Sequence, residues 1–559
     1  MENSFRAIEG CTNEFYLYPR RSFIPLSCFF ISLISSLTLN ANAFRYQTLS
    51  PSKRSRIQLA DSMTAKSDEY KEMTPTLISS AGITHKIAVI GAGAAGLAMA
   101  RVCSRENNSI FDLTVLEKNA HEGGIWRYDN LQKPHGHPMY RGLRTNLPKE
   151  IMAYREWPWT DNLRGVETKD SFVTHEQVLR YLQSYVDQFN LQRLIQRGCE
   201  VTELSLYDSQ TSSLSPSTES WPKIQLRWKE EVTNTMQVHL FDAVCVCNGH
   251  YAQPSIPNIL GLNQNFDGQI LHSISYDDPS VFSKNQTILC IGGRASGSDV
   301  AREVSQYAKK VYLSDSTCPE FEVDPPKLGN VTWVPRTVAV KEVNRLIFQG
   351  NSSSFETSDI DVIIFCSGYD YSFPFITDVK ENTCEKLSLQ VVRGERKVSP
   401  LLDQLWHAQY PNVAFVGLPH SVIPFPLMEL QAEAVCHQWL HGTLPTFEER
   451  IACATRDAES GGPKDPGRVQ DTHHLGRYQW DYCRRLSSLA SNLTPELERY
   501  ILTNKAIYDH SECERKGMIP GGLDTYRSTR YERFDGNVDQ PFRSWKSEHE
   551  QLNNIKSDK

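Results

Sequence analysis

The sequence has few of the features that mark a nucleic-acid-binding or metal-binding protein. Its 559 residues include 59 Lys and Arg against 66 Asp and Glu, a formal net charge of −7, and no long basic run. This balance argues against a nucleic-acid or anionic-membrane partner. The 14 Cys residues form no CxxC pair and no Cys/His cluster at metal-ligand spacing. We therefore expect no metal site and a small-molecule partner.

Four of the cysteines lie inside apolar runs that are typical of buried strands, namely Cys245, Cys247, Cys290 and Cys366. Such residues are most simply reduced thiols in a hydrophobic core. Many unpaired thiols suit a cytosol-like or stromal compartment better than the secretory lumen.

Long apolar runs are also scarce, and the one exception is "FIPLSCFFISLISSLTLNANAF" at residues 23–44. Two arginines precede it and small residues end it, which predicts a signal-peptide-like leader over residues 1–43, with an uncleaved signal anchor as the alternative. The transit-like segment at 44–83 begins with the basic, hydroxyl-rich stretch "FRYQTLSPSKRSRIQ" (44–58), which has no acidic residue before Asp61. Together with the leader it resembles the two-part leaders of algae with complex plastids. We expect delivery to a plastid, with the endoplasmic reticulum as the alternative, and no stable membrane anchor in the mature chain.

A glycine-rich turn follows the apolar β-branched run in "KIAVIGAGAAGLAMARV" at residues 86–102. The order strand, turn and Ala-rich helix is the context that a dinucleotide-binding GxGxxG fingerprint requires. Gly91 allows the tight turn, Gly93 allows a pyrophosphate to approach, and Gly96 lets the helix lie close to the sheet. The next strand ends at Glu117, where an acidic group binds ribose hydroxyls. The alternative is a Gly-rich packing turn.

A second, imperfect copy stands at residues 286–316, "QTILCIGGRASGSDVAREVSQYAKKVYLSDS". Gly292 and Gly297 hold the first and third glycine positions, and Arg294 takes the middle one. Two such units predict two dinucleotides in one chain.

The second copy leaves the identity of its nicotinamide dinucleotide open. Arg294 and the hydroxyl groups of Ser314 and Ser316 favour NADPH, because they suit an extra phosphate. Asp315, at the end of the following strand, favours NADH, because an acidic group there holds a free 2′-hydroxyl.

Between the two copies stands "FDGQILHSISY", residues 266–276. Its Phe266, Gly268, His272 and Tyr276 match every fixed position of FxGxxxHxxx(Y/F), a pattern of the flavin-containing monooxygenases, and the chain resembles that family over about residues 84–445. Further family-like motifs are "GGIWRY" (123–128), "LRTNLPKEIMAYREWPW" (143–159), "FVTHEQVLRYLQSY" (172–185), "VCNGHYAQPSIP" (246–257), "DVIIFCSGYDYSFPF" (361–375) and "VGLPHSVIPFPLMELQAEAV" (416–435).

The resemblance implies an α/β fold of two Rossmann-like, dinucleotide-binding domains, with the NADPH domain inserted into a discontinuous FAD domain. The expected parts are FAD-binding residues 84–249 and 367–458, NADPH-binding residues 250–366, and a linker with a C-terminal extension at 459–559. Residues from about 446 onward match the family pattern only loosely, for example in "HHLGRYQWDYC" (473–483). Whether the extension covers the active site or serves a partner stays open. The family pattern also allows a homodimer.

The activity that the resemblance implies is an NADPH-dependent flavin monooxygenase reaction, in which the cofactors carry the chemistry. NADPH reduces the flavin, O₂ adds to give a C4a-hydroperoxyflavin, and a soft nucleophile, sulfur or nitrogen of a small organic substrate, takes the distal oxygen. Asn146 matches the family asparagine beside the flavin ring, where an amide donates a hydrogen bond without supplying a proton; the alternative is a turn-forming Asn ahead of Pro148. Residues 426–433 should open a helix that points at the flavin, with simple core packing as the alternative.

The residues expected to bind the cofactors are Gly91, Ala92, Gly93, Ala94, Ala95, Gly96, Glu117, Gly124, Ile125, Trp126, Thr145, Asn146, Leu147, Gly292, Arg294, Ser296, Gly297, Ser298 and Gln431.

The stretch 266–276 is interpreted as the seam between the FAD-binding and NADPH-binding parts. Gly268 permits a turn, while His272 and Tyr276 either share one helical face or clamp the linker. We expect His272 to be structural and do not count it as catalytic.

Several rival functions stay open. Baeyer–Villiger relatives end the seam motif in Trp where this chain has Tyr276, and the plant auxin-forming relatives differ around residues 144–154. A disulfide reductase needs a bonded cysteine pair, which Cys245 and Cys247 cannot easily form along one strand. An NADPH oxidase that releases H₂O₂ and a non-catalytic flavin-binding sensor or scaffold complete the alternatives.

Overall fold

The computed structural model describes residues 84–105, 110–129, 136–207, 221–320, 330–377, 387–392, 396–460, 472–516, 524–537 and 539–546. The chain divides into two units, Met1–Lys71 and Glu72–Lys559, and all described residues belong to the second. The leader at 1–43, the segment at 44–83 and most of the linker that begins at 459 lie outside the described residues. Targeting to a plastid or the endoplasmic reticulum therefore stays a prediction.

The first sheet has seven strands in the order β20-β21-β22-β7-β1-β2-β3. Its central strands β22, β7, β1, β2 and β3 are all parallel. This confirms the α/β class that the family resemblance implied. The strands are β1 (His85–Ile90), β2 (Phe111–Glu117), β3 (Ile195–Arg197), β7 (Ala243–Val246), β20 (Leu401–Leu402), β21 (Trp406–His407) and β22 (Val413–Phe415).

Each face of this sheet packs on a different layer, as the alternation of β1 shows. Ile87 and Val89 join the core that includes helices α2 (Ala94–Arg105) and α8 (Pro424–His441). Ala88 and Ile90 join a separate core, which the antiparallel strands β4 (Cys199–Tyr207), β5 (Lys223–Glu230) and β6 (Thr235–Phe241) share. Side chains of successive strand residues point to opposite faces, so one strand contributes to both cores.

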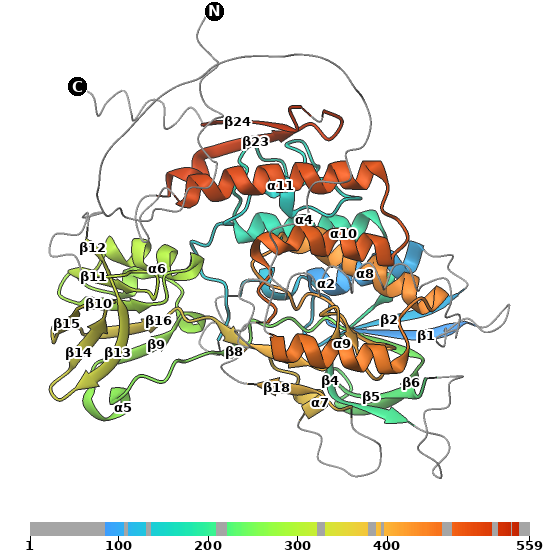
Figure 1. The fold of residues 1–559 in the computed structure, drawn as a ribbon, viewed down its shortest axis with the longest axis horizontal. Coiled ribbons are helices and arrows are strands. Elements are labelled where there is room, and N and C mark those ends of the chain that lie inside the picture. The colour runs from blue at the N-terminus through green and yellow to red at the C-terminus, as the bar shows by residue number, and fades with distance from the viewer. Residues whose placement is uncertain are drawn as a thin grey trace, which may run out of the picture. The chain divides into compact units, whose positions relative to one another are not determined.

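The second sheet repeats this arrangement with the order β12-β11-β10-β16-β9, all parallel. One face of β10 packs on helix α6, and the other packs on the antiparallel strands β13 to β15. In Figure 1 these elements and α5 form a group of their own. Their bounds are β9 (Gln269–His272), β10 (Thr287–Ile291), α6 (Ala295–Ser305), β11 (Lys310–Ser314), β12 (Val331–Val334), β13 (Arg336–Lys341), β14 (Arg345–Gln349), β15 (Ser354–Thr357) and β16 (Val362–Phe365).

The stretch 266–276 is not the seam that the sequence suggested. Residues 269–272 form β9, the edge strand of the second sheet beside β16, so His272 and Tyr276 do not share a helical face. The chain passes between the two sheets at β8 (Gln253–Pro254) and β17 (Tyr369–Asp370), which pair with each other. A short antiparallel pair therefore carries both crossings.

The C-terminal extension is an integral part of the first core. Trp480 and Leu486 of α10 (Gln479–Leu489) and Ile501 of α11 (Pro495–Lys516) are buried in the same cluster as β1, α2 and α8. A hairpin of β23 (Thr529–Arg533) and β24 (Phe542–Lys546) follows. In Figure 1 α11 runs between this hairpin and α10.

The remaining elements connect these layers. Helix α4 starts with a capping box, in which the Thr174 hydroxyl accepts from the Gln177 N–H and the Gln177 amide accepts from the Thr174 N–H. This reciprocal pair satisfies two N–H groups that the helix start would otherwise leave unpaired. The other helices and short strands are α3 (Lys149–Met152), α4 (His175–Gln188), α5 (Leu262–Asn265), α7 (Pro374–Thr377), α9 (Phe447–Ser460), β18 (Gln390–Val392) and β19 (Lys397–Ser399).

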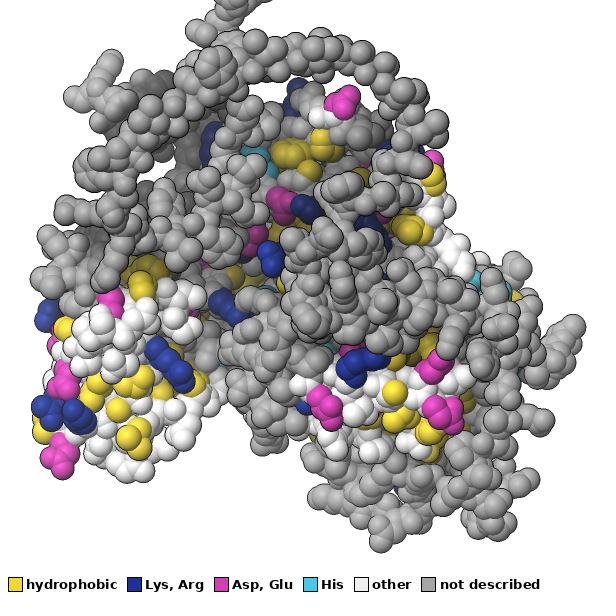
Figure 2. Space-filling view, in the orientation of Figure 1, with side chains coloured by type: hydrophobic (Ala, Val, Ile, Leu, Met, Phe, Trp, Pro, Cys, Tyr) yellow, Lys and Arg dark blue, Asp and Glu magenta, His cyan; other side chains and the backbone are white. Residues whose placement is uncertain are grey.

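The four cysteines singled out from the sequence are all buried, which confirms that prediction. The sulfur atoms of Cys245 and Cys247 lie 3.6 Å apart, too far for a disulfide. In the part of the chain that the structure describes, no helix combines the length and apolarity needed to cross a bilayer, and no cluster of metal-ligating side chains occurs. Figure 2 shows hydrophobic and charged side chains of both signs interspersed over the second group of elements.

The packing of α10 generates a stability prediction. Leu486→Ala removes a fully buried side chain from the first core, so we expect the free energy of unfolding to fall by about 2–5 kcal/mol. Urea unfolding followed by flavin fluorescence measures this. The control Leu493→Ala alters an exposed side chain of the same extension and should change stability by less than ~0.5 kcal/mol; equal effects would show that the extension is not part of the core.

Candidate active site

The first glycine-rich turn is built so that helix α2 lies directly on it. Gly91 has φ +99°, and a Cβ there would lie 2.7 Å from the carbonyl oxygen of Cys247. A Cβ on Gly96 would lie 1.8 Å from the carbonyl oxygen of Gly91. Only hydrogen fits at either position, so the fold itself requires both glycines.

Gly93 differs, because the protein leaves room beside it. A Cβ there would meet nothing closer than the Cα of Gly124, at 3.5 Å, an ordinary contact. Helix α2 begins at the next residue, Ala94, and the first N–H groups of a helix have no partner within the helix. The helix start after this turn is therefore suited to bind an anion. The fold itself does not require a glycine at position 93.

The "GGIW" motif lies against this turn. The Gly123 N–H donates to the carbonyl oxygen of Ala92 (3.0 Å), and the short helix Gly124–Trp126 follows. The Trp126 ring meets the ring of Phe425 edge to face at 6.3 Å between centroids. Because Phe425 stands in the first turn of α8, the motif brings the starts of α2 and α8 to one place.

Glu117 ends β2 as predicted, and its carboxylate is tied to the turn. It is 4% exposed, and it accepts hydrogen bonds from the N–H groups of Ala92 (2.8 Å) and Asn119 (2.9 Å). Its first role in the structure is thus to hold the turn. The predicted ribose contact would need the remaining acceptor sites of these two oxygens.

Asn146 stands in a backbone segment that is fixed on its N-terminal side. The Thr145 N–H donates to the carbonyl oxygen of Val173 (2.8 Å), and the Val173 N–H donates to the Thr145 hydroxyl (3.0 Å). Leu147 packs on the first core. Asn146 itself is half-buried, and no described residue hydrogen-bonds its amide. The backbone that leads into Asn146 is thus held in place, and the amide keeps its donors for another molecule.

Helix α8 begins at Pro424, two residues before the predicted start. The fully buried Gln431 accepts from the Gly417 N–H (2.9 Å) and donates to the Tyr482 hydroxyl (3.1 Å). Both ends of this predicted cofactor ligand are thus engaged within the protein, and Tyr482 is a contact that the sequence did not indicate.

Gly417 links α8 to the first turn. A Cβ there would lie 3.3 Å from the Cβ of Ala95 and 3.2 Å from the methyl carbon of Met428. One residue further along α8, burial raises the pKa of Glu429 to about 7. The start of α8 therefore lies against the start of α2.

The second turn repeats the first. Gly292 has φ +110°, with a virtual Cβ 2.6 Å from the carbonyl oxygen of Cys366, and a Cβ on Gly297 would lie 1.6 Å from the carbonyl oxygen of Gly292. The Ser298 hydroxyl donates to the carbonyl oxygen of Gly293 (2.9 Å). Arg294 stands at the N-cap position of α6 without a side-chain capping bond, and its side chain and that of Ser296 are exposed.

The structure shows that Ser314 and Asp315, two of the residues used to distinguish NADPH from NADH, already have partners within the protein. Ser314 is buried; its hydroxyl donates to the carbonyl oxygen of Pro335 and accepts from the Thr337 N–H, so its predicted contribution to phosphate binding is wrong. Asp315 accepts from the Gly293 N–H (2.6 Å) and the Thr317 N–H (2.7 Å). It holds the second turn as Glu117 holds the first.

The residues of the stretch 266–276 have protein partners. His272 accepts from the Ile274 N–H (3.1 Å) and contacts the carbonyl oxygen of Gly368 (3.1 Å), and burial lowers its pKa. The Tyr276 hydroxyl donates to Glu303 of α6 (2.7 Å). His272 thereby fastens β9 to the crossing at Gly368, which is the structural role expected of it.

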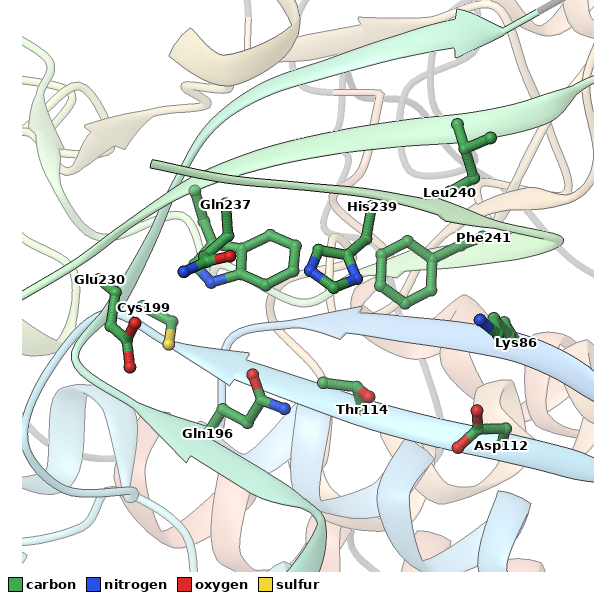
Figure 3. Close-up of a pocket in the computed structure, with 11 residues that line it drawn as sticks. Lys86, Asp112, Thr114, Gln196, Cys199, Glu230, Gln237, His239, Leu240 and Phe241 are labelled. Carbon is green, nitrogen blue, oxygen red and sulfur yellow. The ribbon is translucent and has the colours of Figure 1, made fainter. Parts of the chain in front are cut away.

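A cavity of about 340 Å³ lies elsewhere, beside the amino-terminal parts of β1 and β2. Figure 3 shows Gln237, His239 and Phe241 pointing from β6 toward Thr114 and Gln196. None of the predicted cofactor residues lines it. In parallel α/β sheets, dinucleotides bind outside the carboxyl ends of the strands, so this cavity is not the cofactor site.

The described residues fit two dinucleotides. Each fingerprint turn follows the carboxyl end of a central parallel strand, opens a helix and is held by a carboxylate. At Gly93 the open side of the turn is the feature that a pyrophosphate requires and that the fold does not.

Comparisons with known proteins agree with this geometry. Residues 84–319 match the model of the family described as flavin-binding monooxygenase-like. Among curated proteins of Arabidopsis thaliana, flavin-containing monooxygenase FMO GS-OX5 is 31% identical over 76% of this chain and 88% of its own. FMO GS-OX-like 4 is 30% identical over 72% and 87%, respectively. The solved S-allyl-L-cysteine S-oxygenase from Allium sativum is 27% identical, covers 80% of this chain and 95% of its own, and superposes with a TM-score of 0.66.

Gly93 allows a test that separates cofactor binding from folding. Because the apoprotein tolerates a Cβ at this position, Gly93→Asp should fold. It should bind no FAD, because the new carboxylate would overlap the pyrophosphate and repel its negative charge. Flavin absorbance per protein measures the loss. Gly536→Asp adds a carboxylate at an open position and should keep the flavin. Stoichiometric flavin in Gly93→Asp would overturn the assignment of the first turn.

Arg294 makes a second prediction at the other turn. If its exposed guanidinium binds the 2′-phosphate, Arg294→Ala should raise the KM for NADPH by roughly 10- to 100-fold, equivalent to a charge-assisted bond of about 1.5–3 kcal/mol. The KM for NADH should change little. An equal rise for both dinucleotides would instead place Arg294 at the shared pyrophosphate or in folding.

Proposed function

The chain belongs to the flavin-containing monooxygenases, which use FAD, NADPH and O₂, and we propose that it oxygenates the sulfur atom of a small thioether. The monooxygenase class follows from the family. One similarity supports sulfur over nitrogen as the oxygen acceptor: the solved S-allyl-L-cysteine S-oxygenase matches over 80% of this chain.

The observation that carries the reaction type is the Asn146 amide, which lies in a fixed segment with no hydrogen-bond partner among the described residues. When FAD is bound, it accepts hydride from NADPH and activates O₂. Oxygen transfer then requires that the activated oxygen is not lost as H₂O₂, and a proton delivered to it promotes that loss. An amide donates a hydrogen bond without releasing its proton, so Asn146 is suited to hold the oxygen.

The first turn of α8 contributes electrostatically. The positive end of its helix dipole favours the negative charge that a flavin acquires on reduction. Of the residues in this turn, Phe425 offers an N–H group, whereas Pro424 and Pro426 have none. The Gly417 N–H donates to Gln431 of α8, and a Cβ on Gly417 would touch both Ala95 and Met428, so this helix start lies close to the first glycine-rich turn. The protein's part is therefore to bind, orient and stabilise charge.

The proposal is tested with the purified full chain, NADPH and ¹⁸O₂. We expect S-allyl-L-cysteine to yield a sulfoxide that carries one ¹⁸O atom, detected by mass spectrometry. Oxygenation of a tertiary amine of matched size without sulfoxide would establish nitrogen as the acceptor. NADPH consumption matched by H₂O₂ would indicate an oxidase, and a stably reduced or unreactive flavin would indicate a sensor or scaffold.

Asn146→Ala tests the proposed role of the amide. We expect the variant to keep FAD and to oxidise NADPH, but to release H₂O₂ in place of product, because losing one positioned donor costs about 2–4 kcal/mol of stabilisation. The ratio of H₂O₂ to sulfoxide per NADPH measures this. Asn162→Ala, at an exposed position nearby in sequence, is the control. Unchanged ratios in Asn146→Ala would leave Asn146 as a turn residue.

A further inference from the structure

The C-terminal extension places one buried arginine between the two dinucleotide-binding units. Arg527, in the short helix Thr525–Ser528, is 5% exposed. Its Nε donates to the carbonyl oxygen of Thr145 (2.9 Å), and its Nη1 and Nη2 donate to the two carboxylate oxygens of Asp299 (3.0 and 2.7 Å). One side chain thereby joins three segments that are far apart in the sequence.

The contact with Thr145 reaches the candidate catalytic amide. The carbonyl group of Thr145 belongs to the peptide bond that leads into Asn146, and a peptide group is planar. The Thr145 N–H is held by Val173 on the other side (2.8 Å). Arg527 therefore fixes the peptide plane from which the Asn146 side chain projects.

The contact with Asp299 reaches the second unit. Asp299 lies in α6, two residues after Gly297, in the helix that the second glycine-rich turn opens. Arg302 also donates to Asp299 (2.7 Å) and lies 3.4 Å from Asp524, which in turn accepts from Arg527 (2.8 Å). Two arginines and two aspartates thus alternate in a closed ring.

Residues 140–146, the segment that leads to Asn146, also lie along α6 beyond this ring. A Cβ on Gly142 would lie 2.7 Å from a carboxylate oxygen of Glu303, and the Tyr276 hydroxyl donates to Glu303. The Tyr140 and Tyr276 rings meet at 5.3 Å between centroids. Residues 140–146 are therefore packed between α6 and the C-terminal extension, and Arg527 closes that contact with three buried hydrogen bonds.

Arg527 keeps its charge in this position. Burial acts to lower the pKa of the guanidinium, but the hydrogen bonds and the charge of Asp299 outweigh it and raise the pKa. A charged, planar group with both carboxylate oxygens engaged fixes orientation more strictly than an ammonium group does.

We propose that Arg527 is a positioning residue that sets Asn146 and the NADPH-binding helix α6 in fixed relation to each other. Hydride delivery from the second unit and retention of oxygen at the first are then coupled through one side chain. The proposal rests on the role of Asn146 proposed above, and it adds that the C-terminal extension is needed for coupled turnover.

The test compares Arg527→Lys, Arg527→Met and Asp299→Asn in the full chain. Arg543→Met is the matched control, because Arg543 lies in the β23–β24 hairpin of the same extension and makes exposed contacts, an ion pair with Glu532 and a stacking contact over the Trp545 ring. Four quantities are measured: flavin per protein, the KM and kcat for NADPH, H₂O₂ released per NADPH, and hydrogen exchange of peptides covering 140–147 and 295–305.

We expect the Arg527 and Asp299 variants to keep FAD, to raise the KM for NADPH and the H₂O₂ to product ratio by at least about fivefold each, and to exchange faster in both peptides. The double variant Arg527→Lys/Asp299→Asn should be little worse than either single one, because both belong to one network. Arg543→Met should match the wild type.

The proposal is overturned if flavin-loaded Arg527→Lys and Asp299→Asn show wild-type KM, H₂O₂ release and exchange, or if neither retains flavin, since Arg527 would then serve folding alone. Failure of Arg527→Met to fold leaves the decision to these two milder variants. The KM and exchange readouts need no oxygen acceptor, so they distinguish failure of this proposal from failure of thioether oxygenation.

Discussion

The contact on which both cofactor sites depend is the approach of a helix to the carbonyl oxygen of the turn that precedes it. Virtual Cβ atoms on Gly96 and Gly297 would lie 1.8 and 1.6 Å from the carbonyl oxygens of Gly91 and Gly292. Such distances admit hydrogen only. Because α2 and α6 lie this close to their sheets, their N-termini lie directly beside the carboxyl ends of the central strands. We expect each dinucleotide to bind at the helix N-terminus that this steric constraint positions.

The carboxylates that end the second strands are part of the same constraint. Glu117 accepts from the Ala92 N–H and Asp315 from the Gly293 N–H, at equivalent positions of the two turns. An acidic residue at this place was interpreted from sequence as a ribose ligand, and Asp315 was therefore an argument for NADH. With its carboxylate engaged by the turn, Asp315 is explained without a free 2′-hydroxyl. The NADPH dependence of the family and an acidic residue at 315 are thus compatible.

The local parts of the fold could be predicted from sequence, and the distant contacts could not. The strand, turn and helix units depend on glycines and apolar runs within about 30 residues, and the structure has them where the pattern placed them. The stretch 266–276 was misplaced because a four-residue edge strand beside β16 has no pattern of its own. Gln431 and Ser314 are residue types that bind cofactors elsewhere, and only the structure shows that Tyr482, Gly417, Pro335 and Thr337 occupy them.

The C-terminal extension shows that a segment without clear motifs can still be an essential part of the core. Residues beyond 459 match the family pattern only loosely, yet Trp480 and Leu486 lie in the core of the first sheet. The two dinucleotide-binding units, built on the first and the second sheet, are joined in sequence only through the β8–β17 pair, which has two residues in each strand. So short a pair resists rotation weakly, because it offers few hydrogen bonds and little buried surface. A second attachment at α6 limits that rotation, and the ring of Arg527, Asp299, Arg302 and Asp524 provides one at a distance from the crossing. The extension is therefore best understood as the part of the chain that turns two linked dinucleotide-binding units into a single catalytic body.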